Sequence, residues 1–322
     1  MEPSDTKSDL IDFHVHLAGV PDGNNGCYIS PAMQKGALIR FIAWRHGLPL
    51  SDPARANRLY VERLMKRLSA SRRVGKAVAL GMDGVYDDAG RFDDKETDFL
   101  VSNDYVLSTV AAHGDRLLAG VSINPRRGDA VEEIHRCAEK GAFLVKVLPN
   151  TQRFDPSSKS FLPYYRALAA RRLPFLSHVG YEFSLWGKDQ SVGDPARLRT
   201  ALDEGVTVIA AHGASYGLFL HEKYWDTLLD LVKRYPRFYW DASALTLPNR
   251  VGMLLRLRRH PELVERMLFG TDYPLPVFAF PPLLAGKPTA FLKSFWTTNP
   301  FDRQWEVLVA LGLPPKAGWP WK

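Results

Sequence analysis

Cysteine is scarce in this sequence of 322 residues, which contains Cys27 and Cys137 and no other cysteine. The two residues lie far apart in the chain and form no CxxC pair, which excludes a cysteine-based zinc site and a disulfide framework. A chain of this length can bury a large share of its surface without such cross-links. We therefore expect an ordinary apolar core to stabilise the fold.

Long hydrophobic runs are also missing. No uncharged apolar stretch approaches the roughly 18 residues that a membrane span requires, and residues 1–10 are polar and lack the apolar core of a signal peptide. With 46% hydrophobic and 24% charged residues, the composition is that of a globular protein and excludes disorder of the whole chain. We expect a cytoplasmic protein with no membrane partner.

Positive charge is in excess, but no single segment carries it. The chain has 42 Lys and Arg against 35 Asp and Glu, a formal net charge of +7. The basic residues between positions 55 and 73 are spaced as on the solvent face of a helix, and no zinc-finger spacing, RNP-type strand or heptad repeat accompanies them. We expect no nucleic-acid partner. The surplus charge fits the steering of a small, anionic substrate, and the sequence is compatible with a homodimer.

Short apolar runs recur along the chain and predict eight strands. The runs are rich in Val, Ile, Leu and Phe and mostly lack alternation, which is typical of parallel strands buried on both faces. Helical patterns, for example at 158–172, 196–203, 221–234 and 250–259, separate many of them. Eight strands alternating with helices predict an α/β fold, the (β/α)8 or TIM barrel. The expected strands span 10–17, 75–82, 117–123, 142–148, 174–178, 206–212, 237–241 and 267–272.

Two stretches are longer than this plan requires. One runs from about 18 to 73, between the first two expected strands, and the other from about 273 to 322. Both contain many aromatic side chains, so neither is typical of a linker. We expect them to cover a mouth of the barrel within one domain of residues 1–322.

Residues with metal-binding side chains cluster at the ends of the expected strands. Active sites of TIM barrels lie at the carboxyl ends of the strands. His14 and His16 are two apart on one strand, so their side chains point to the same side. Imidazole and carboxylate ligands suit Zn²⁺, and a catalytic zinc usually has three protein ligands and a water. The strand-end candidates are His14, His16, Lys146, His178, His212 and Asp272.

These strand ends resemble the motifs of the amidohydrolase superfamily. The resemblance is carried by the stretches 11–16 (IDFHVH), 145–149 (VKVLP), 177–180 (SHVG), 211–213 (AHG) and 269–274 (FGTDYP). It is strongest to the amidohydrolase-2 group, which includes proteins similar to aminocarboxymuconate-semialdehyde decarboxylase. The resemblance implies a metal-dependent enzyme in which His14, His16, His178 and Asp272 bind the metal. It makes His212 either a ligand of a second metal or a proton-transfer residue.

Lys146 leaves the number of metals open. In binuclear members of the superfamily, a lysine on the fourth strand forms a carbamate that bridges two metals. The alternative is a lysine that pairs with Asp272 or with a substrate carboxylate. Leu148 departs from the common pattern, because many relatives carry histidine at this place before the proline. The expected cofactor is therefore one Zn²⁺, or two with a carbamate on Lys146, and Mn²⁺ or another divalent metal suits the same ligands.

The resemblance implies a hydrolase that uses a zinc-activated water on an ester, lactone or amide bond of a small-molecule substrate. A catalytic metal lowers the pKa of its water to about 7, and Asp272 would accept the water proton. The alternative is a metal-dependent non-oxidative decarboxylase, a lyase that acts on a small carboxylic acid. A non-catalytic binding protein would require a lost ligand, and none is missing. From the first long stretch we expect Arg40, Trp44 and Arg45 to contact the substrate.

Overall fold

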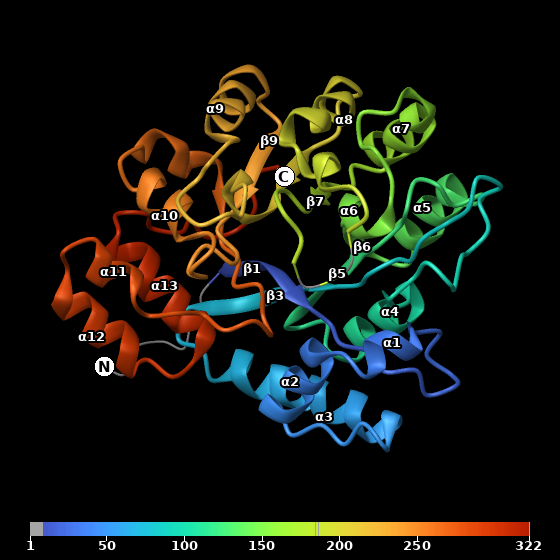
Figure 1. The fold of residues 1–322 in the computed structure, drawn as a ribbon, viewed down its shortest axis with the longest axis horizontal. Coiled ribbons are helices and arrows are strands. Elements are labelled where there is room, and N and C mark those ends of the chain that lie inside the picture. Colours follow the sequence, from blue (N-terminus) through green and yellow to red (C-terminus); the bar gives the residue numbers. More distant parts are fainter. Residues whose placement is uncertain (1–8, 184, 186, 322) are drawn as a thin grey trace.

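The computed structural model describes residues 9–183, 185 and 187–321. Within them, eight parallel strands form one sheet in the order β1-β3-β5-β6-β7-β8-β9-β10 (Figure 1). All eight expected strands are present, and the prediction of an α/β barrel is confirmed. The strands are β1 (Leu10–His16), β3 (Val74–Leu80), β5 (Leu117–Val121), β6 (Ala142–Val147), β7 (Phe175–Ser177), β8 (Val208–Ala210), β9 (Phe238–Asp241) and β10 (Met267–Leu268).

Backbone hydrogen bonds between β1 and the segment after β10 bring the two edges of the sheet together. The Phe13 amide donates to the Phe269 carbonyl at 2.8 Å, and the His16 amide donates to the Tyr273 carbonyl at 2.7 Å. The Asp272 amide in turn donates to the His14 carbonyl at 2.9 Å. These bonds nearly close the barrel, and they place Asp272 beside the two histidines of β1.

Most helices of the repeating units lie around the outside of the strands (Figure 1). The expected helix 158–172 is divided, because Phe161 ends a short 3-10 turn and Pro163 stands in the first turn of the helix that follows. The expected helix 196–203 is divided in the same way, into Pro195–Leu198 and Arg199–Asp203. The helices are α4 (Asn103–Ala112), α5 (Ala130–Glu139), α6 (Pro149–Gln152), α7 (Leu162–Ala170), α8 (Arg199–Asp203), α9 (Trp225–Arg234) and α10 (Val251–Leu257), with 3-10 turns at Lys159–Phe161, Gln190–Gly193, Pro195–Leu198, Ala211–Ala214 and Pro261–Arg266.

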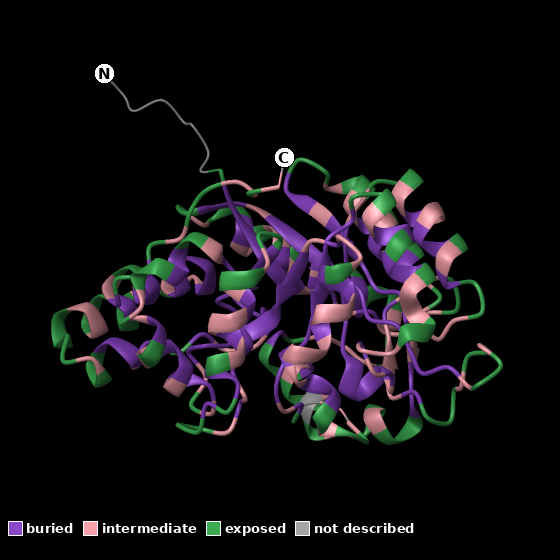
Figure 2. Cartoon of the chain, turned by 90° about the horizontal axis from the view of Figure 1, so that it is seen from above, coloured by how far each residue is buried: buried purple, intermediate pink, exposed green. Residues whose placement is uncertain are grey.

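Two layers of apolar side chains hold the barrel together. A large cluster fills the space between strands and helices, and a smaller one, which includes Ile11, Phe13 and Leu176, fills the barrel interior. Trp321 packs edge-on against Phe13 and Tyr239, near the amino ends of β1 and β9. The buried residues therefore occupy the centre of the molecule in Figure 2, and the exposed residues its rim.

The stretch from 18 to 73 contains a short strand and three helices. β2 (Tyr28–Ile29) pairs antiparallel with β4 (Phe99–Leu100), a small second sheet that the sequence patterns did not indicate. Tyr60 of the third helix donates a hydrogen bond to the His16 carbonyl at 2.7 Å, so this stretch is fixed to the end of β1. The helices are α1 (Pro31–Gln34), α2 (Ala37–Arg45) and α3 (Pro53–Ser69).

Part of the stretch after residue 273 packs beside α3. The Asp302 carboxylate accepts hydrogen bonds from the Ser71 hydroxyl at 2.7 Å and from the Arg72 amide at 3.1 Å, which ties α13 to the end of α3. Its helices are α11 (Pro281–Leu284), α12 (Pro288–Trp296) and α13 (Pro300–Ala310). Among the helices of the described residues, none combines the length and the apolar character that crossing a bilayer requires.

Candidate active site

One cavity of about 500 Å³ opens at the carboxyl ends of the strands. All six strand-end candidates line it, although they come from five different strands or the loops that follow them. The lining also includes Ile42 and Tyr60 of the first long stretch and Pro274 and Leu275 of the second. The cavity residues predicted from the sequence are His14, His16, Lys146, His178, His212 and Asp272.

Arg40, Trp44 and Arg45 lie elsewhere. None of the three is among the residues that line this cavity. Trp44 is 79% exposed, and Arg45 lines a different cleft. From the same helix, α2, Ile42 faces the cavity instead. The side of α2 that faces the site was therefore not evident from the sequence.

An irregularity in β1 directs both histidines of the His-x-His motif inward. Asp12 pairs with Ala77 and Val15 with Ala79, so β1 has one extra residue between these pairs. A bulge of this kind redirects the side chains that follow it. The His14 side chain is fully buried, whereas the His16 side chain is 29% exposed. His14 thus lies at the floor of the cavity and His16 nearer its opening.

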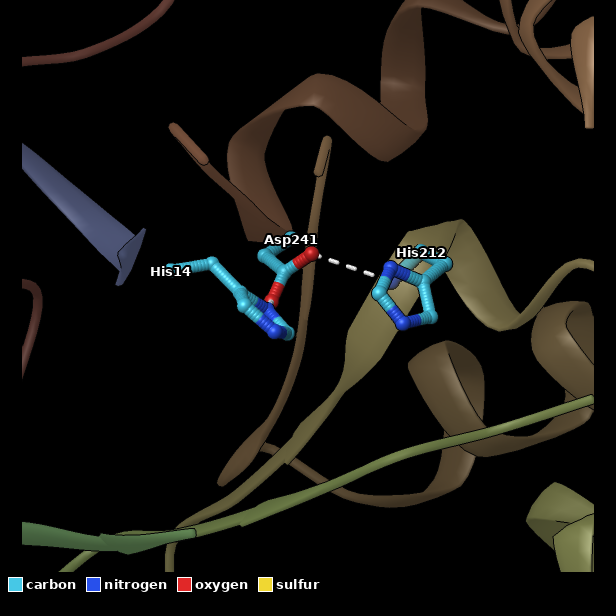
Figure 3. A group of neighbouring side chains, drawn as sticks. All are labelled: His14, His212 and Asp241. Carbon is cyan, nitrogen blue, oxygen red and sulfur yellow. Dashed lines mark hydrogen bonds and ion pairs between the residues drawn. The ribbon is translucent and has the colours of Figure 1, made fainter. Parts of the chain in front are cut away.

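Asp241, at the end of β9, lies between His14 and His212 and contacts both (Figure 3). Its carboxylate lies 2.8 Å from His14 Nδ1 and accepts the His212 amide at 3.0 Å. It also accepts the Ser243 amide at 3.0 Å and the Ser243 hydroxyl. Burial opposes ionisation of Asp241, but its contacts with His14, Ser243 and Lys146 keep its pKa below the usual range. Asp241 was not singled out in the sequence; its only signal was its place at a strand end.

The ionised Asp241 determines which ring nitrogen carries the proton in His14, His212 and His178. Because it only accepts hydrogen bonds, His14 must donate through Nδ1, and the Ser243 hydroxyl must donate to it as well. His212 Nδ1, 2.8 Å from Ser243 Oγ, then donates to that oxygen. His212 Nε2 is left as the acceptor for His178 Nδ1 at 3.1 Å. This arrangement leaves Nε2 of both His14 and His178 with a free lone pair.

Three buried nitrogen atoms of the cavity have no hydrogen-bond partner among the described residues: His14 Nε2, His178 Nε2 and Lys146 Nζ. Asp272 Oδ1 lies 3.4 Å from His14 Nε2 and 3.1 Å from His16 Nε2. Buried polar atoms are normally satisfied, so a cluster of unsatisfied ones marks a place for a ligand. In the part of the chain that the structure describes, two groups of three have the spacing of metal ligands, His14-His16-Asp272 and His14-His212-Asp241. In the second group both ring nitrogens of His212 are already hydrogen-bonded, so the first group fits a metal better.

The charges of the cavity support neutral imidazoles beside an ionised carboxylate. Burial lowers the pKa of His14, and it lowers the pKa of His178 and His212 further, with help from Arg250 and Lys146. Burial also lowers the pKa of Lys146, to about 8, although nearby carboxylates oppose this. Burial alone would raise the pKa of Asp272, but His14, His16 and Lys146 hold it well below the usual range.

Arg250 and Glu182 also line the cavity, and no sequence motif indicated either residue. Arg250 is buried and donates to the carbonyls of Ser215 at 3.1 Å and Tyr181 at 3.2 Å. Glu182 Oε2 is 3.5 Å from His178 Nε2. Arg250 precedes α10 and Glu182 follows β7, so only the folding of two loops brings them to the site.

Backbone strain accompanies the site. His212 and Asp272 have φ values of 58° and 64°, in the left-handed region. Such conformations cost energy in residues other than glycine and are found preferentially at functional sites. The strain is consistent with side chains that are held in fixed directions.

Comparison with known proteins agrees with the geometry. The sequence profile of the amidohydrolase family matches residues 11–314, whereas no curated protein sequence matches the chain. An uncharacterised TIM-barrel protein from Bordetella bronchiseptica is structurally similar, with a TM-score of 0.60, 16% identity and coverage of 94% of this chain and 99% of that one.

Two further solved structures have names that describe activities. One is a putative 2-pyrone-4,6-dicarboxylic acid hydrolase from Pseudomonas putida, with a TM-score of 0.52, 12% identity and coverage of 95% and 98%. The other is 2,6-dihydroxybenzoate decarboxylase from Rhizobium, with a TM-score of 0.48, 14% identity and coverage of 94% and 98%. At these identities the likeness concerns the fold. The family profile spans nearly the whole chain, and the chain therefore belongs to the amidohydrolase family, a family of metal-dependent enzymes.

Proposed function

We propose that the protein is a metal-dependent hydrolase of a small organic acid that contains an ester, lactone or amide bond. The observation that carries this proposal is the set of unpartnered nitrogens, His14 Nε2, His178 Nε2 and Lys146 Nζ, which line one cavity together with the ionised Asp272. A buried cluster of this kind is costly unless a ligand completes it.

The donor set fits a divalent metal. His14, His16, His178 and Asp272 would hold it, and the mixture of imidazole and carboxylate suits zinc, with manganese as the alternative. When bound, such a metal polarises a carbonyl oxygen and lowers the pKa of water. The hydrogen bond from His14 Nδ1 to Asp241 supports this assignment. Histidine ligands of metals commonly donate a hydrogen bond from their second ring nitrogen to a carboxylate.

Asp272 is the proposed general base. Its low pKa keeps it ionised at neutral pH, and its Oδ1 faces His16, the histidine nearer the opening. It would accept a proton from the attacking water and return it to the leaving group. His212 would act as a positioning residue, because its Nε2 accepts from His178 and fixes the direction of that ring.

The walls of the cavity indicate the kind of substrate. Leu17, Met82, Phe99 and Leu247 give the cavity an apolar lining, which suits the carbon skeleton of a small molecule. Arg250 and Lys146 are the buried cations of this lining. A substrate carboxylate would add a favourable interaction for both cations, whose charges Asp272 and Glu182 already offset in part.

The apolar walls of the cavity also suit a second candidate, non-oxidative decarboxylation. A substrate carboxylate against these walls would be poorly solvated, which favours its loss as the uncharged CO₂. The decarboxylase and the hydrolase would use the same binding groups. They differ in the bond that is broken and in the use of water.

The test combines metal analysis with a substrate panel of lactones, aryl esters and aromatic acids. We expect the purified protein to contain a divalent metal and the His14→Ala/His16→Ala variant to lose it while remaining folded. Hydrolysis must incorporate ¹⁸O from labelled water into the product, whereas decarboxylation releases ¹³CO₂ from a labelled carboxyl group without that incorporation. Asp272→Asn should lower kcat at least a hundredfold for either reaction. Unchanged metal content in the folded double variant would refute the site assignment.

A further inference from the structure

A second cleft, of about 990 Å³, lies between the helices α2 and α3 on one side and the end of α12 with the turn into α13 on the other. We call it the basic cleft. It shares no lining residue with the catalytic cavity. Its cationic lining residues are Arg45, Arg63, Lys66, Arg67, Arg72 and Lys293.

Most of this positive charge is not compensated. Lys293 pairs with Glu306 at 2.7 Å, and Asp302, the acidic lining residue, is engaged by the Ser71 hydroxyl and by backbone amides. Within the described residues, none of the other five cations has a carboxylate within ion-pair distance. Arginines elsewhere on the surface commonly do have one, as in the pairs Arg166–Glu204, Arg171–Glu139 and Arg199–Asp230. The basic cleft thus brings together five cations that lack a carboxylate partner among the described residues.

His46 adds a buried polar group to the wall of the basic cleft. The residue is 3% exposed, and its Nε2 has no hydrogen-bond partner among the described residues. Its Nδ1 lies 3.3 Å from the Tyr273 hydroxyl. Burial lowers the pKa of His46 to about 4, and the charges of Arg67, Arg45 and Arg63 act in the same direction. An anion in the cleft would offset the repulsion among these groups.

The absence of a side chain at Gly47 leaves room for the Arg63 guanidinium close to the backbone. A Cβ atom at this position would be 3.1 Å from Arg63 Nη1 and 3.2 Å from Arg63 Nη2, and Gly47 has a φ of +51°. Arg63 is only half-buried, yet it is held at the wall of the cleft and does not extend freely into solvent. Guanidinium groups held in this way bind the oxygens of phosphate in pairs.

We propose that the basic cleft binds an oligophosphate ligand. Five uncompensated cations exceed what a single phosphate needs, and the volume is within the range of small-molecule sites. Trp296, which is 75% exposed at the rim, offers a flat face on which a base can stack. Free tripolyphosphate and a nucleoside triphosphate share the phosphate chemistry, and Trp296 distinguishes them. A long nucleic acid fits less well, because five of the cations line one cleft of small-molecule size.

An aromatic layer separates the basic cleft from the catalytic cavity. The His46 ring lies 5.8 Å from the Tyr60 ring and 5.5 Å from the Tyr273 ring. Tyr60 lines the catalytic cavity, and Tyr273 follows the proposed base Asp272. The oligophosphate site is therefore independent of the proposed reaction, although a single layer of side chains lies between the two.

The test is isothermal titration of the metal-loaded protein with sodium tripolyphosphate and with adenosine triphosphate in excess Mg²⁺. The key variant is Arg63→Gln/Arg67→Gln. Its matched control is Arg55→Gln/Arg58→Gln, which removes the same charge from exposed positions of the same helix outside the cleft. We expect at least a tenfold loss of affinity for both ligands in the key variant and less than a twofold change in the control. Metal content is measured after each titration, so that metal extraction does not mimic binding.

Two further arms complete the test. Trp296→Leu should weaken binding of adenosine triphosphate about tenfold, a typical stacking contribution, and leave tripolyphosphate binding unchanged. If the double variant does not fold, as judged by circular dichroism, Lys66→Gln and Arg67→Gln are titrated singly and should each weaken binding. Equal losses in the key and control variants would overturn the proposal. Tighter binding of duplex DNA than of either small ligand at the same salt concentration would also overturn it.

Discussion

Replacing Asp241 with asparagine should reduce the affinity of the site for its metal. The new side chain has the same shape, and its oxygen can still accept the His212 and Ser243 amides, each at 3.0 Å in the native protein. The amide nitrogen that replaces the second oxygen cannot accept the proton of His14 Nδ1, now 2.8 Å away. His14 must then either move its proton to Nε2 or keep an unpaired donor.

Both outcomes weaken metal binding. A proton on Nε2 removes the lone pair that we assign to the metal, and an unpaired buried donor costs roughly 1–3 kcal/mol. Because about 1.4 kcal/mol corresponds to a factor of ten, we expect the dissociation constant of the metal to rise roughly 10- to 100-fold, the range known for comparable supporting residues. Competition with a chromophoric chelator measures this constant directly, without a known substrate.

Asp12→Asn is the matched control, because it also neutralises a buried carboxylate next to His14. Asp12 accepts the His14 amide at 2.9 Å and the Thr271 hydroxyl at 2.6 Å, but it has no contact with the His14 ring among the hydrogen bonds of the described residues. Burial raises the pKa of Asp12 to about 7, so the carboxyl group is partly ionised near neutral pH, and its replacement changes the charge beside His14 without removing a hydrogen bond of the His14 ring. We expect less than a threefold change in metal affinity. Equal effects of the two substitutions, or no effect of Asp241→Asn, would refute the role of Asp241 in setting the His14 tautomer.

Three other predictions concern the proposed lysine carbamate, acid stability and the core. Lys146→Met should keep one metal per chain, because the four proposed ligands are unchanged; if elemental analysis shows two metals in the native protein and one in the variant, the carbamate-bridged pair is correct instead. Burial opposes ionisation of Glu133, but hydrogen bonds, chiefly from Arg136, lower its pKa from 4.5 to about 2. Its stabilising effect is therefore complete above about pH 5 and lost as the pH falls toward 2, and after allowance for the partial exposure of Arg136 it amounts to about 2 kcal/mol. Urea unfolding of Glu133→Gln should show this difference at pH 7 and roughly half of it or less at pH 3, and equal differences would contradict it. Phe175→Ala should lower the free energy of unfolding by roughly 3–5 kcal/mol, because its ring is fully buried between the barrel and α7, and a loss below 1 kcal/mol would be inconsistent with that packing.

The barrel itself was predictable because burial leaves a direct record in the sequence. A strand that is covered on both faces must be apolar throughout, so each of the eight runs was visible without knowledge of its partners. The short strands β2 and β4 were not visible, because two residues each are too few to form a pattern. The divided helices near residues 161 and 198 were missed since their boundaries depend on local caps and prolines.

The residues at the strand ends were predictable for a similar reason. In a parallel barrel, all carboxyl ends meet at one mouth, so His14, His178 and Asp272 had to be near one another once the strands were known. The tertiary structure alone decided the contacts below and around them. It placed Asp241 under His14, brought Arg250 into the cavity through a loop, and turned Ile42 toward the site. Such contacts depend on loop paths and helix rotation, which are set by packing between segments distant in the chain and leave no periodic pattern in the sequence.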